Sequence, residues 1–390
     1  MNDKQISFQD TSIAFADKSD KELRRMNILF ALMGTHELTK VGIFFIKTAF
    51  VLKIPIKKII KKTLFKQFCG GETLQECDIV AKKLYNSGIQ SIPDYSIEGA
   101  SDENSFDDSM QMVLKTIEMA KNNKAIGFCV FKCSGIASSL LLEKVQKKKA
   151  LTASEENDYK RFQERIDAIC GKAFSENIKI LVDAEESWIQ EVIDFHVLEM
   201  MEKYNGKKNV VYNTYQMYKK NSMADLKLAF DFAREKQFHL AVKLVRGAYM
   251  EKEKSRAAKE NYSSPIHITK ADTDSSYHEG LMFCVKNKIA LCAGSHNEES
   301  NKRLMDLMKE NNIKNDDPLI YFAQLFGMSD PISYNLSAAG YCVAKYLPFG
   351  PVESVMPYLF RRAEENKSVT GQTSRELRLV RAEMKRRKKQ

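Results

Sequence analysis

The sequence lacks the residue patterns that mark several classes of protein. Its 390 residues include eight cysteines without a CxxC pair and six histidines without an HxH pair. A zinc site needs closely spaced Cys or His ligands, so the sequence predicts no metal site and disfavours a metal hydrolase. Several cysteines lie inside apolar runs such as GFCVF and IALCAG, which predicts reduced, buried thiols.

Signals for export and for membrane insertion are also missing from the first part of the chain. The segment 1–22 is polar and rich in aspartate, unlike a secretory signal or an Arg-rich transit peptide. The apolar run 41–56 is interrupted by Lys47, Lys53 and Pro55, which argues against a membrane span. These features predict a cytoplasmic protein of bacterial type; in a eukaryote, the mitochondrial inner membrane is the alternative location.

The positive charge of the chain is confined to two segments. The formal net charge is +10, and Lys47–Lys66 carries +7 while Arg375–Gln390 carries +6, so the remainder carries −3. A nucleic-acid-binding protein usually spreads its basic residues over one face or one motif, and no such motif is present. The charge pattern therefore argues against nucleic-acid binding.

Eight short apolar runs alternate with charged segments of helical periodicity. Near-continuous apolar character suits strands that are covered on both faces, as in a parallel sheet. Eight such units favour a closed (β/α)8 barrel; an open doubly wound sheet is the alternative, but its Gly-rich phosphate turn is missing. The predicted strands are 89–97, 125–134, 178–185, 209–216, 239–248, 288–296, 319–326 and 341–347.

The segments between and around these runs predict the domain organisation. Residues 1–85 contain no strand run and predict an α-helical N-terminal arm, followed by a barrel over 86–372 and a basic tail over 373–390. Helical periodicity inside the barrel region predicts helices over 102–121, 158–176, 223–236 and 301–311.

Polar residues stand at or near the ends of most of the apolar runs. In a (β/α)8 barrel the carboxyl ends of the strands form the active-site face. One such residue would equally suit a structural ion pair, but residues at seven strand ends indicate an enzyme. They are Lys132, Asp183, Glu185, Asn213, Gln216, Lys243, Arg246, Ser295, His296, Asn297, Gln324 and Tyr346.

A helix after the eighth run carries two adjacent arginines. Pro351 predicts the helix start, and Tyr358, Arg361 or Arg362, and Glu365 are three or four residues apart, so they share a face. Two guanidiniums beside a tyrosine suit bidentate binding of a carboxylate or phosphate. A solvated surface pair is the alternative.

Six motifs, in order, resemble those of proline dehydrogenases over about residues 85–370. They are DAEES, VYNTYQMY, VKLVRGAYM, KADTDSSY, SHN and YLPFG…YLFRRAEEN. The resemblance implies a distorted (β/α)8 barrel that binds FAD at the strand carboxyl ends, which would account for the missing dinucleotide motif. It also implies oxidation of L-proline to Δ1-pyrroline-5-carboxylate, with electrons passed on to a quinone.

The resemblance implies a substrate site built from both ends of the barrel sequence. Arg361, Arg362 and Lys132 would bind the proline carboxylate, and four side chains would pack against or near the ring: Tyr249, Leu325, Tyr346 and Tyr358. Members that oxidise hydroxyproline have a smaller residue at the position of Tyr346. The tyrosine therefore implies a preference for proline over 4-hydroxyproline.

The resemblance also implies the residues that act on the cofactor. Asp183 would be the polar active-site residue of the third strand, and Lys243 would lie beside flavin N5, where several bacterial relatives have arginine. A lysine offers a point charge instead of a planar fork. The remaining contacts to FAD would come from Ala184, Asn213, Arg246, Gly247, Ala248, Lys270, Ser295, His296 and Asn297.

The basic segments suggest a location for the electron acceptor. Ile59, Ile60 and Leu64 fall at helical spacing, with lysines on the other faces. We hypothesise that this helix, within 47–66, and the tail, within 375–390, bind the inner face of an anionic membrane that contains the quinone. The alternative is a helix packed on the barrel with solvated lysines.

Two other functional classes remain open from the residues alone. A Schiff-base barrel enzyme of the class I aldolase type would use Lys132 or Lys243 as its nucleophile. A non-enzymatic binding protein would act through the basic ends of the chain. Borohydride trapping against a flavin spectrum would distinguish the first alternative, and removal of the basic ends would test the second by whether it spares the activity.

Overall fold

The structure is a computed structural model that describes residues 6–34, 42–46, 48, 52, 54–96, 102–365 and 372–389. The chain forms two compact units, one made of residues 1–98 with 324–390 and the other of residues 99–323. We call these unit 1 and unit 2 and describe each by itself. Among the described residues, no helix is both long and apolar enough to cross a bilayer.

All eight predicted runs form strands, and the strands are parallel. In the sheet they follow the order β1-β8-β7-β6-β5-β4-β3-β2, which is the strand order of a (β/α)8 barrel. The predicted fold is therefore confirmed. The strands are β1 (Ile89–Tyr95), β2 (Cys129–Lys132), β3 (Ile180–Asp183), β4 (Val211–Gln216), β5 (Ala241–Val245), β6 (Ala290–Gly294), β7 (Ile320–Leu325) and β8 (Val343–Phe349).

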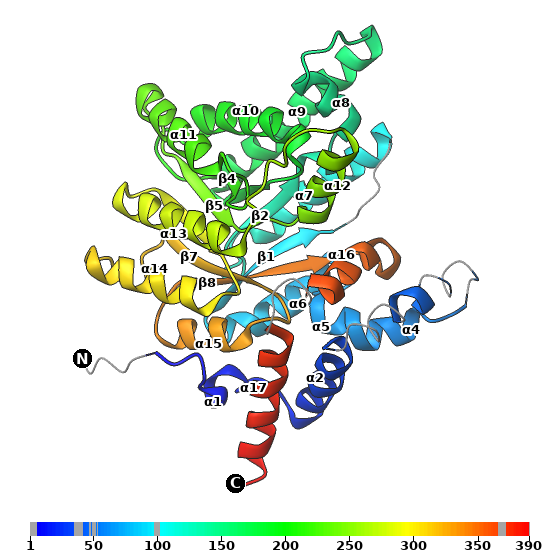
Figure 1. The fold of residues 1–390 in the computed structure, drawn as a ribbon, viewed down its shortest axis with the longest axis vertical. Helices are drawn as coiled ribbons and strands as arrows, with labels where there is room; N and C mark the ends of the chain where they lie inside the picture. Colours follow the sequence, from blue (N-terminus) through cyan, green and yellow to red (C-terminus); the bar gives the residue numbers. More distant parts are fainter. Residues whose placement is uncertain are drawn as a thin grey trace. The chain divides into compact units, whose positions relative to one another are not determined.

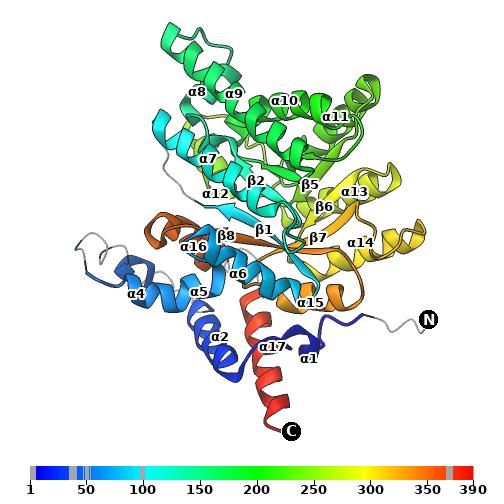
Figure 2. The same cartoon turned by 180° about the vertical axis from the view of Figure 1, so that it is seen from behind.

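The helices of unit 2 connect its strands, and local capping sets their bounds. A capping box between Thr152 and Glu155 starts one helix at Ala153, earlier than the hydrophobic period alone predicts. Among them, α9, α10 and α11 contact β4, and α13 contacts β5 (Figures 1 and 2). The helices are α7 (Glu103–Ala120), α8 (Ser139–Gln146), α9 (Ala153–Glu176), α10 (Ser187–Tyr204), α11 (Ser222–Lys236), α12 (Met250–Lys259), α13 (Lys270–Lys286) and α14 (Glu298–Glu310).

Unit 1 surrounds β1 and β8 with helices from both ends of the chain. Before β1, the described residues form helices and no strand. The helices are α1 (Thr11–Ala14), α2 (Asp20–Met33), α4 (Lys57–Ile60), the π-helix η1 (Lys61–Phe65), α5 (Lys66–Phe68), α6 (Leu74–Tyr85), α15 (Asp330–Ala338), α16 (Val352–Glu365) and α17 (Gln372–Arg387).

One hydrophobic cluster joins the N-terminal and C-terminal helices of unit 1. It contains Leu23 and Phe30 of α2, Leu359 of α16, and Leu379 and Val380 of α17. The basic C-terminal segment is therefore a helix with a buried apolar side. Burial of such side chains stabilises the folded chain by about 1.5–3 kcal/mol each, which holds α17 in the unit.

Buried polar contacts also hold β8 and α17 to the segment that begins α15. The side chain of Lys345 is fully buried, with Nζ 2.9 Å from Asp330 Oδ1. Glu376 of α17 accepts a hydrogen bond from the backbone N–H of Ser329 at 2.9 Å, and burial raises the pKa of Glu376 to about 7. Buried charges persist where they are paired, so this network fixes the chain around β8.

Candidate active site

A buried ion pair joins the end of β3 to the middle of β5. Nζ of Lys243 lies 2.5 Å from Oδ1 of Asp183, and both residues are at least nine-tenths buried. Lys132 is in register with Asp183 on the neighbouring strand β2. Asp183 and Lys243 are the two residues predicted to act in catalysis, and the structure brings them together. Pairing offsets the cost of burying each charge.

The strand register decides which side chains of β4 share a face with Lys243. Thr214 is in register with Lys243, and Asn213 with Val242, so Thr214 and Asn213 point to opposite faces. The amide of Asn213 donates to Oδ1 of Asp194 on α10 at 2.7 Å. Its predicted contact with the cofactor therefore rests on the resemblance alone and stays a prediction.

Two polar residues stand on the Lys243 face of β4: Thr214, which the sequence did not single out, and Gln216, which it predicted only as a strand-end residue. Thr214 Oγ1 is buried and has no hydrogen-bond partner among the residues described. Gln216 is buried, and its amide nitrogen donates to the carbonyl of Glu185 at 2.7 Å while its amide oxygen accepts from the N–H of Ala248 at 3.0 Å. Residues two apart on a strand share a face, so the position of Gln216 could have identified Thr214 as a second polar residue on that face.

A cationic cluster follows β5 and β6. Arg246 donates to Asp274 at 2.7 Å and to the hydroxyls of Ser295 and Ser300 at 2.8 Å each, and Lys270 also donates to Asp274. Burial would raise the pKa of Asp274, but the hydrogen bond from Lys270 and the charge of Arg246 outweigh it and lower that pKa. Two cationic side chains share one carboxylate, so the cluster keeps a net positive charge. This charge favours the binding of an anionic ligand.

Gly247, next to this cluster, has a backbone that only glycine adopts easily. Its φ is +140°, and a Cβ there would lie 2.5 Å from the ring of Tyr218. Gly247 and Ala248 are exposed, so a ligand can approach their backbone, where the N–H of Ala248 is already bonded to Gln216. Ser295 is buried, and Asn297 caps α14 by accepting from the N–H of Ser300 at 3.0 Å.

The remaining predicted residues of unit 2 lie at the ends of the same strands or begin the next helix. Ala184 is buried directly after β3, and His296 is half-buried after β6. Tyr249 is the N-cap residue of α12, and Nζ of Lys252 lies 5.4 Å from the centre of its ring. Unit 2 thus carries Lys132, Tyr249 and the whole predicted cofactor set.

Unit 1 carries the rest of the predicted substrate site. Tyr358 and Arg362 are four residues apart on α16, and the Arg362 guanidinium lies 5.2 Å from the centre of the Tyr358 ring. Arg362 is 7% exposed and Arg361 is half-buried, which disfavours a solvated surface pair. The side chain of Glu365 lies outside the described part of the structure. Cation–π contact holds the guanidinium in one orientation.

Leu325 and Tyr346 complete this group in unit 1. The carbonyl of Tyr346, in the middle of β8, accepts the N–H of Phe326 at 2.9 Å, so Tyr346 lies beside Leu325 at the end of β7. Leu325 also packs against the hydrophobic cluster that contains Tyr358. The arginine, the two tyrosines and the leucine therefore belong to one region of unit 1.

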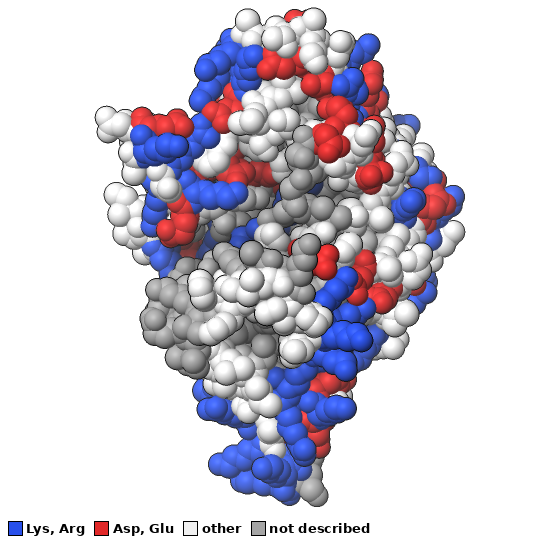
Figure 3. Space-filling view, turned by 90° about the vertical axis from the view of Figure 1, so that its right-hand side faces the viewer, with Lys and Arg blue, Asp and Glu red and all other residues white. Residues whose placement is uncertain are grey.

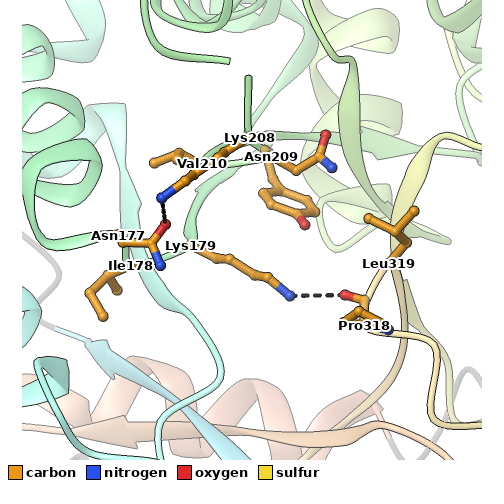
Figure 4. Close-up of a pocket in the computed structure, with 9 residues that line it drawn as sticks. Asn177, Ile178, Lys179, Lys208, Asn209, Val210, Pro318 and Leu319 are labelled. Atoms are coloured by element: carbon orange, nitrogen blue, oxygen red, sulfur yellow. Dashed lines mark hydrogen bonds between the residues drawn. The ribbon is translucent and has the colours of Figure 1, made fainter. Parts of the chain in front are cut away.

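A cavity of about 270 Å³ lies at the other ends of the strands in unit 2 (Figure 4). Lys179, just before β3, lines it and donates to the carbonyl of Pro318 at 2.9 Å. Its other lining residues also lie at or near the starts of β3, β4 and β7. The amino ends of barrel strands usually serve stability, so we do not assign the active site to this cavity.

A parallel (β/α)8 barrel with a buried acid–lysine pair and a cationic cluster at its strand ends has the organisation of a barrel enzyme. The family model for proline dehydrogenase matches residues 78–375. The chain belongs to the proline dehydrogenase family and is an enzyme of that family.

Three similar proteins illustrate the match. The chain is 35% identical to mitochondrial proline dehydrogenase 1 of Dictyostelium discoideum over 86% of this chain and 67% of that protein. It is 29% identical to hydroxyproline dehydrogenase of Xenopus laevis over 98% of this chain and 90% of that protein. The structure of proline utilization A from Bdellovibrio bacteriovorus has a TM-score of 0.73 and 20% identity, covering 92% of this chain but 38% of that one. This last likeness concerns the fold.

Proposed function

We propose that the protein oxidises L-proline to Δ1-pyrroline-5-carboxylate, with FAD as the hydride acceptor and a quinone as the final electron acceptor. The proposal starts from the family membership. The structural observation that carries it is the buried guanidinium of Arg362 beside the ring of Tyr358. A fixed guanidinium next to an aromatic ring suits a small amino acid with a carboxylate and an apolar ring.

The strand ends of unit 2 fit a flavin dinucleotide. Gly247 leaves room for close approach to the backbone, and the cluster of Arg246 and Lys270 suits a diphosphate. The buried hydroxyl of Thr214, without a partner among the described residues, offers a further polar contact. Residues that would hold FAD are Ala184, Asn213, Lys243, Arg246, Gly247, Ala248, Lys270, Ser295, His296 and Asn297, joined by Thr214 and Gln216. FAD, when bound, supplies the acceptor for a hydride.

The chain's own residues would prepare proline for oxidation. Arg361, Arg362 and Lys132 would hold the carboxylate, and their positive charge disfavours a protonated ring nitrogen, which must be neutral for hydride to leave C5. The apolar and aromatic side chains at Tyr249, Leu325, Tyr346 and Tyr358 would orient the ring and exclude water. Lys243, held by Asp183, would direct an N–H group at the reacting region.

The absorption spectrum of the purified protein tests the proposal. We expect flavin bands that bleach when L-proline is added without oxygen and return when a soluble quinone is added. A colourless protein, or a yellow protein whose bands proline leaves unchanged, would overturn the proposal. Borohydride trapping with carbonyl substrates tests the Schiff-base alternative, which requires covalent labelling of Lys132 or Lys243.

Tyr346 is expected to set the preference for proline over 4-hydroxyproline. It is 8% exposed in the middle of β8, and its ring would occupy the space that a hydroxyl on the substrate ring needs. Tyr346→Ser should raise kcat/KM for 4-hydroxy-L-proline relative to proline by roughly tenfold, because pocket volume discriminates at about this scale. Tyr346→Phe is the control and should keep the preference for proline. Equal selectivity in all three proteins would contradict the prediction.

We further propose that the helical segment 57–68 contacts an anionic membrane, although with a face different from the predicted one. Ile60 is buried and Leu64 packs on the unit 1 cluster, so of the three predicted apolar residues only Ile59 is exposed, at 65%. Lys58, Lys62 and Lys66 are all exposed and four residues apart. Lys47 and Lys53 lie outside the described residues.

Several of the other charges in the basic segments are paired. Nζ of Lys61 lies 2.6 Å from the Glu72 carboxylate, and Arg386 and Arg387 both pair with Glu383. Lys and Arg side chains gather near the end of α17 (Figure 3). A cytoplasmic protein held at the inner face of the cytoplasmic membrane, or at the mitochondrial inner membrane in a eukaryote, is the location that this proposal implies.

Replacement of Lys58, Lys62 and Lys66 by glutamine is expected to weaken sedimentation with anionic vesicles about a hundredfold, since each lysine contributes about 1 kcal/mol near such a surface. The matched control, Lys286→Gln with Lys288→Gln in unit 2, should bind like the unmodified protein. Failure of the unmodified protein to bind phosphatidylglycerol vesicles, or equal binding to phosphatidylcholine vesicles, would contradict the proposal.

A further inference from the structure

Glu185 is a buried carboxylate without a cationic hydrogen-bond partner among the described residues. It follows β3 and is 2% exposed. Its carboxylate accepts the backbone N–H of Ser134 at 2.8 Å and also the hydroxyl of the same residue. Burial of a carboxylate costs free energy, and two neutral donors offset only part of this cost. A carboxylate that stays buried despite this cost is a candidate functional residue.

The backbone N–H and carbonyl of Glu185 also make hydrogen bonds, one to α10 and one to β4. Its N–H donates to Oε1 of Gln190 on α10 at 2.7 Å, and its carbonyl accepts from Nε2 of Gln216 at 2.7 Å. Oε1 of Gln216 in turn accepts the N–H of Ala248 at 3.0 Å. One connected set of hydrogen bonds thus runs from Ser134 after β2, through Glu185 after β3 and Gln216 at the end of β4, to Ala248 after β5.

This set of hydrogen bonds spans the strand ends that carry the candidate site. Ser134 is two residues beyond Lys132, and Glu185 is two residues beyond Asp183. Ala248 follows Arg246 and Gly247. A small displacement of any of these loops would move a predicted substrate or cofactor contact, and misplacement by about 1 Å can cost a hundredfold in rate.

The electrostatic surroundings make the charge of Glu185 responsive near neutral pH. Burial raises the pKa of Glu185 to about 7, opposed by the hydrogen bonds from Ser134. The charge of Glu186 raises this pKa further, and the charge of Lys132 lowers it. The thiol of Cys133 also adjoins Glu185, and burial, followed by the charge of Glu185, raises the pKa of that thiol well above its usual value.

We propose that Glu185 is a positioning residue of the active site, whose ionised carboxylate holds the loop after β2 in register with the loops after β3, β4 and β5. When the carboxylate takes up a proton, it keeps one good acceptor for two donors of Ser134, so the loop that follows Lys132 loosens. The functional meaning of that loop rests on the proposed function, whereas the hydrogen-bond set does not. Because its pKa is raised, the carboxylate is ionised above about pH 7 and neutral below.

Three substitutions test this role in opposite directions. Glu185→Gln removes the titration and should lower kcat/KM for proline by roughly tenfold above neutral pH, mainly through KM, because it keeps the shape but not the charge. Ser134→Ala removes a hydrogen bond to the ionised form and should move the midpoint of the pH profile upward. Glu186→Gln is the matched control: it lies next in sequence, pairs instead with Lys252 at 2.5 Å, and should move the midpoint slightly downward.

Carbon-13 NMR of glutamate carboxyls gives a readout that is independent of catalysis. One resonance should titrate near neutral pH, vanish in Glu185→Gln, and shift its midpoint upward in Ser134→Ala. A Glu185→Gln protein with unchanged KM and an unchanged pH profile would overturn the inference, as would a midpoint that Ser134→Ala leaves in place. If the protein binds no flavin or does not oxidise proline, the proposed function fails, and the NMR titrations still decide whether Ser134 and Glu185 are coupled as inferred.

Discussion

Arg362→Met is expected to raise KM for L-proline by about 30-fold to 1000-fold, which corresponds to a loss of about 2–4 kcal/mol of binding energy. The guanidinium is buried beside the ring of Tyr358, so its charge would act on a carboxylate at low solvent screening. Methionine keeps an unbranched side chain that packs on the same ring, so the effect should come from the lost charge. Steady-state kinetics with proline measures it.

Arg361→Met should give an effect in the same direction, because the adjacent guanidinium is also assigned to the carboxylate. FAD content, measured by absorbance, should stay that of the unmodified protein in both variants. Arg378→Met on α17 is the matched control, because Arg378 donates to Gln9 on the exposed side of unit 1. Unchanged KM in both Arg361→Met and Arg362→Met would refute the assignment of the substrate carboxylate to α16.

Lys243→Met is expected to lower the free energy of unfolding by about 3–5 kcal/mol, because it leaves the carboxylate of Asp183 buried without its partner. Catalysis should fall as well, since Lys243 is the predicted neighbour of the flavin. Urea denaturation followed by fluorescence gives the stability, and kcat gives the catalytic effect.

A second substitution separates the two effects. Asp183→Asn added to Lys243→Met removes the unpaired charge and should restore most of the lost stability but little of the activity. Lys243→Arg keeps a cation where several bacterial relatives have one and should keep more activity than Lys243→Met. A Lys243→Met protein as stable and as active as the unmodified protein would contradict the role of the pair.

The sequence already contained the local signals of this fold. Each apolar run became a strand because continuous apolar residues over a short length suit a strand covered on both faces. The hydrophobic period predicts that one helix begins at Asp158, but α9 begins earlier, at Ala153. The capping box of Thr152 and Glu155 sets this start, and its signal lies in polar residues and not in the hydrophobic period. Pro93 weakened the first run, yet β1 stands at one end of the sheet order, where proline is tolerated.

The predicted site residues depended on a different kind of information. The resemblance supplied the list, and the structure showed how some of its members are held. The amide of Asn213 turns to Asp194 on α10, whereas Gln216, three residues later, faces the loops that follow β3 and β5. A strand's two-residue period gives two faces, and only packing of the sheet against its helices decides which face each residue has.

By itself, the sequence determined the eight strand runs, the helical arm before them, and the motifs that mark the proline dehydrogenase family. These follow from short-range periodicity, capping and residue order. Tertiary structure alone decided that Lys243 pairs with Asp183, sixty positions away in the chain, and that Ser134 satisfies Glu185. It also decided that Ile60 and Leu64 turn inward, leaving Lys58, Lys62 and Lys66 exposed. The reason is physical: the partner of a buried charge or apolar side chain comes from distant segments, and no local pattern specifies it.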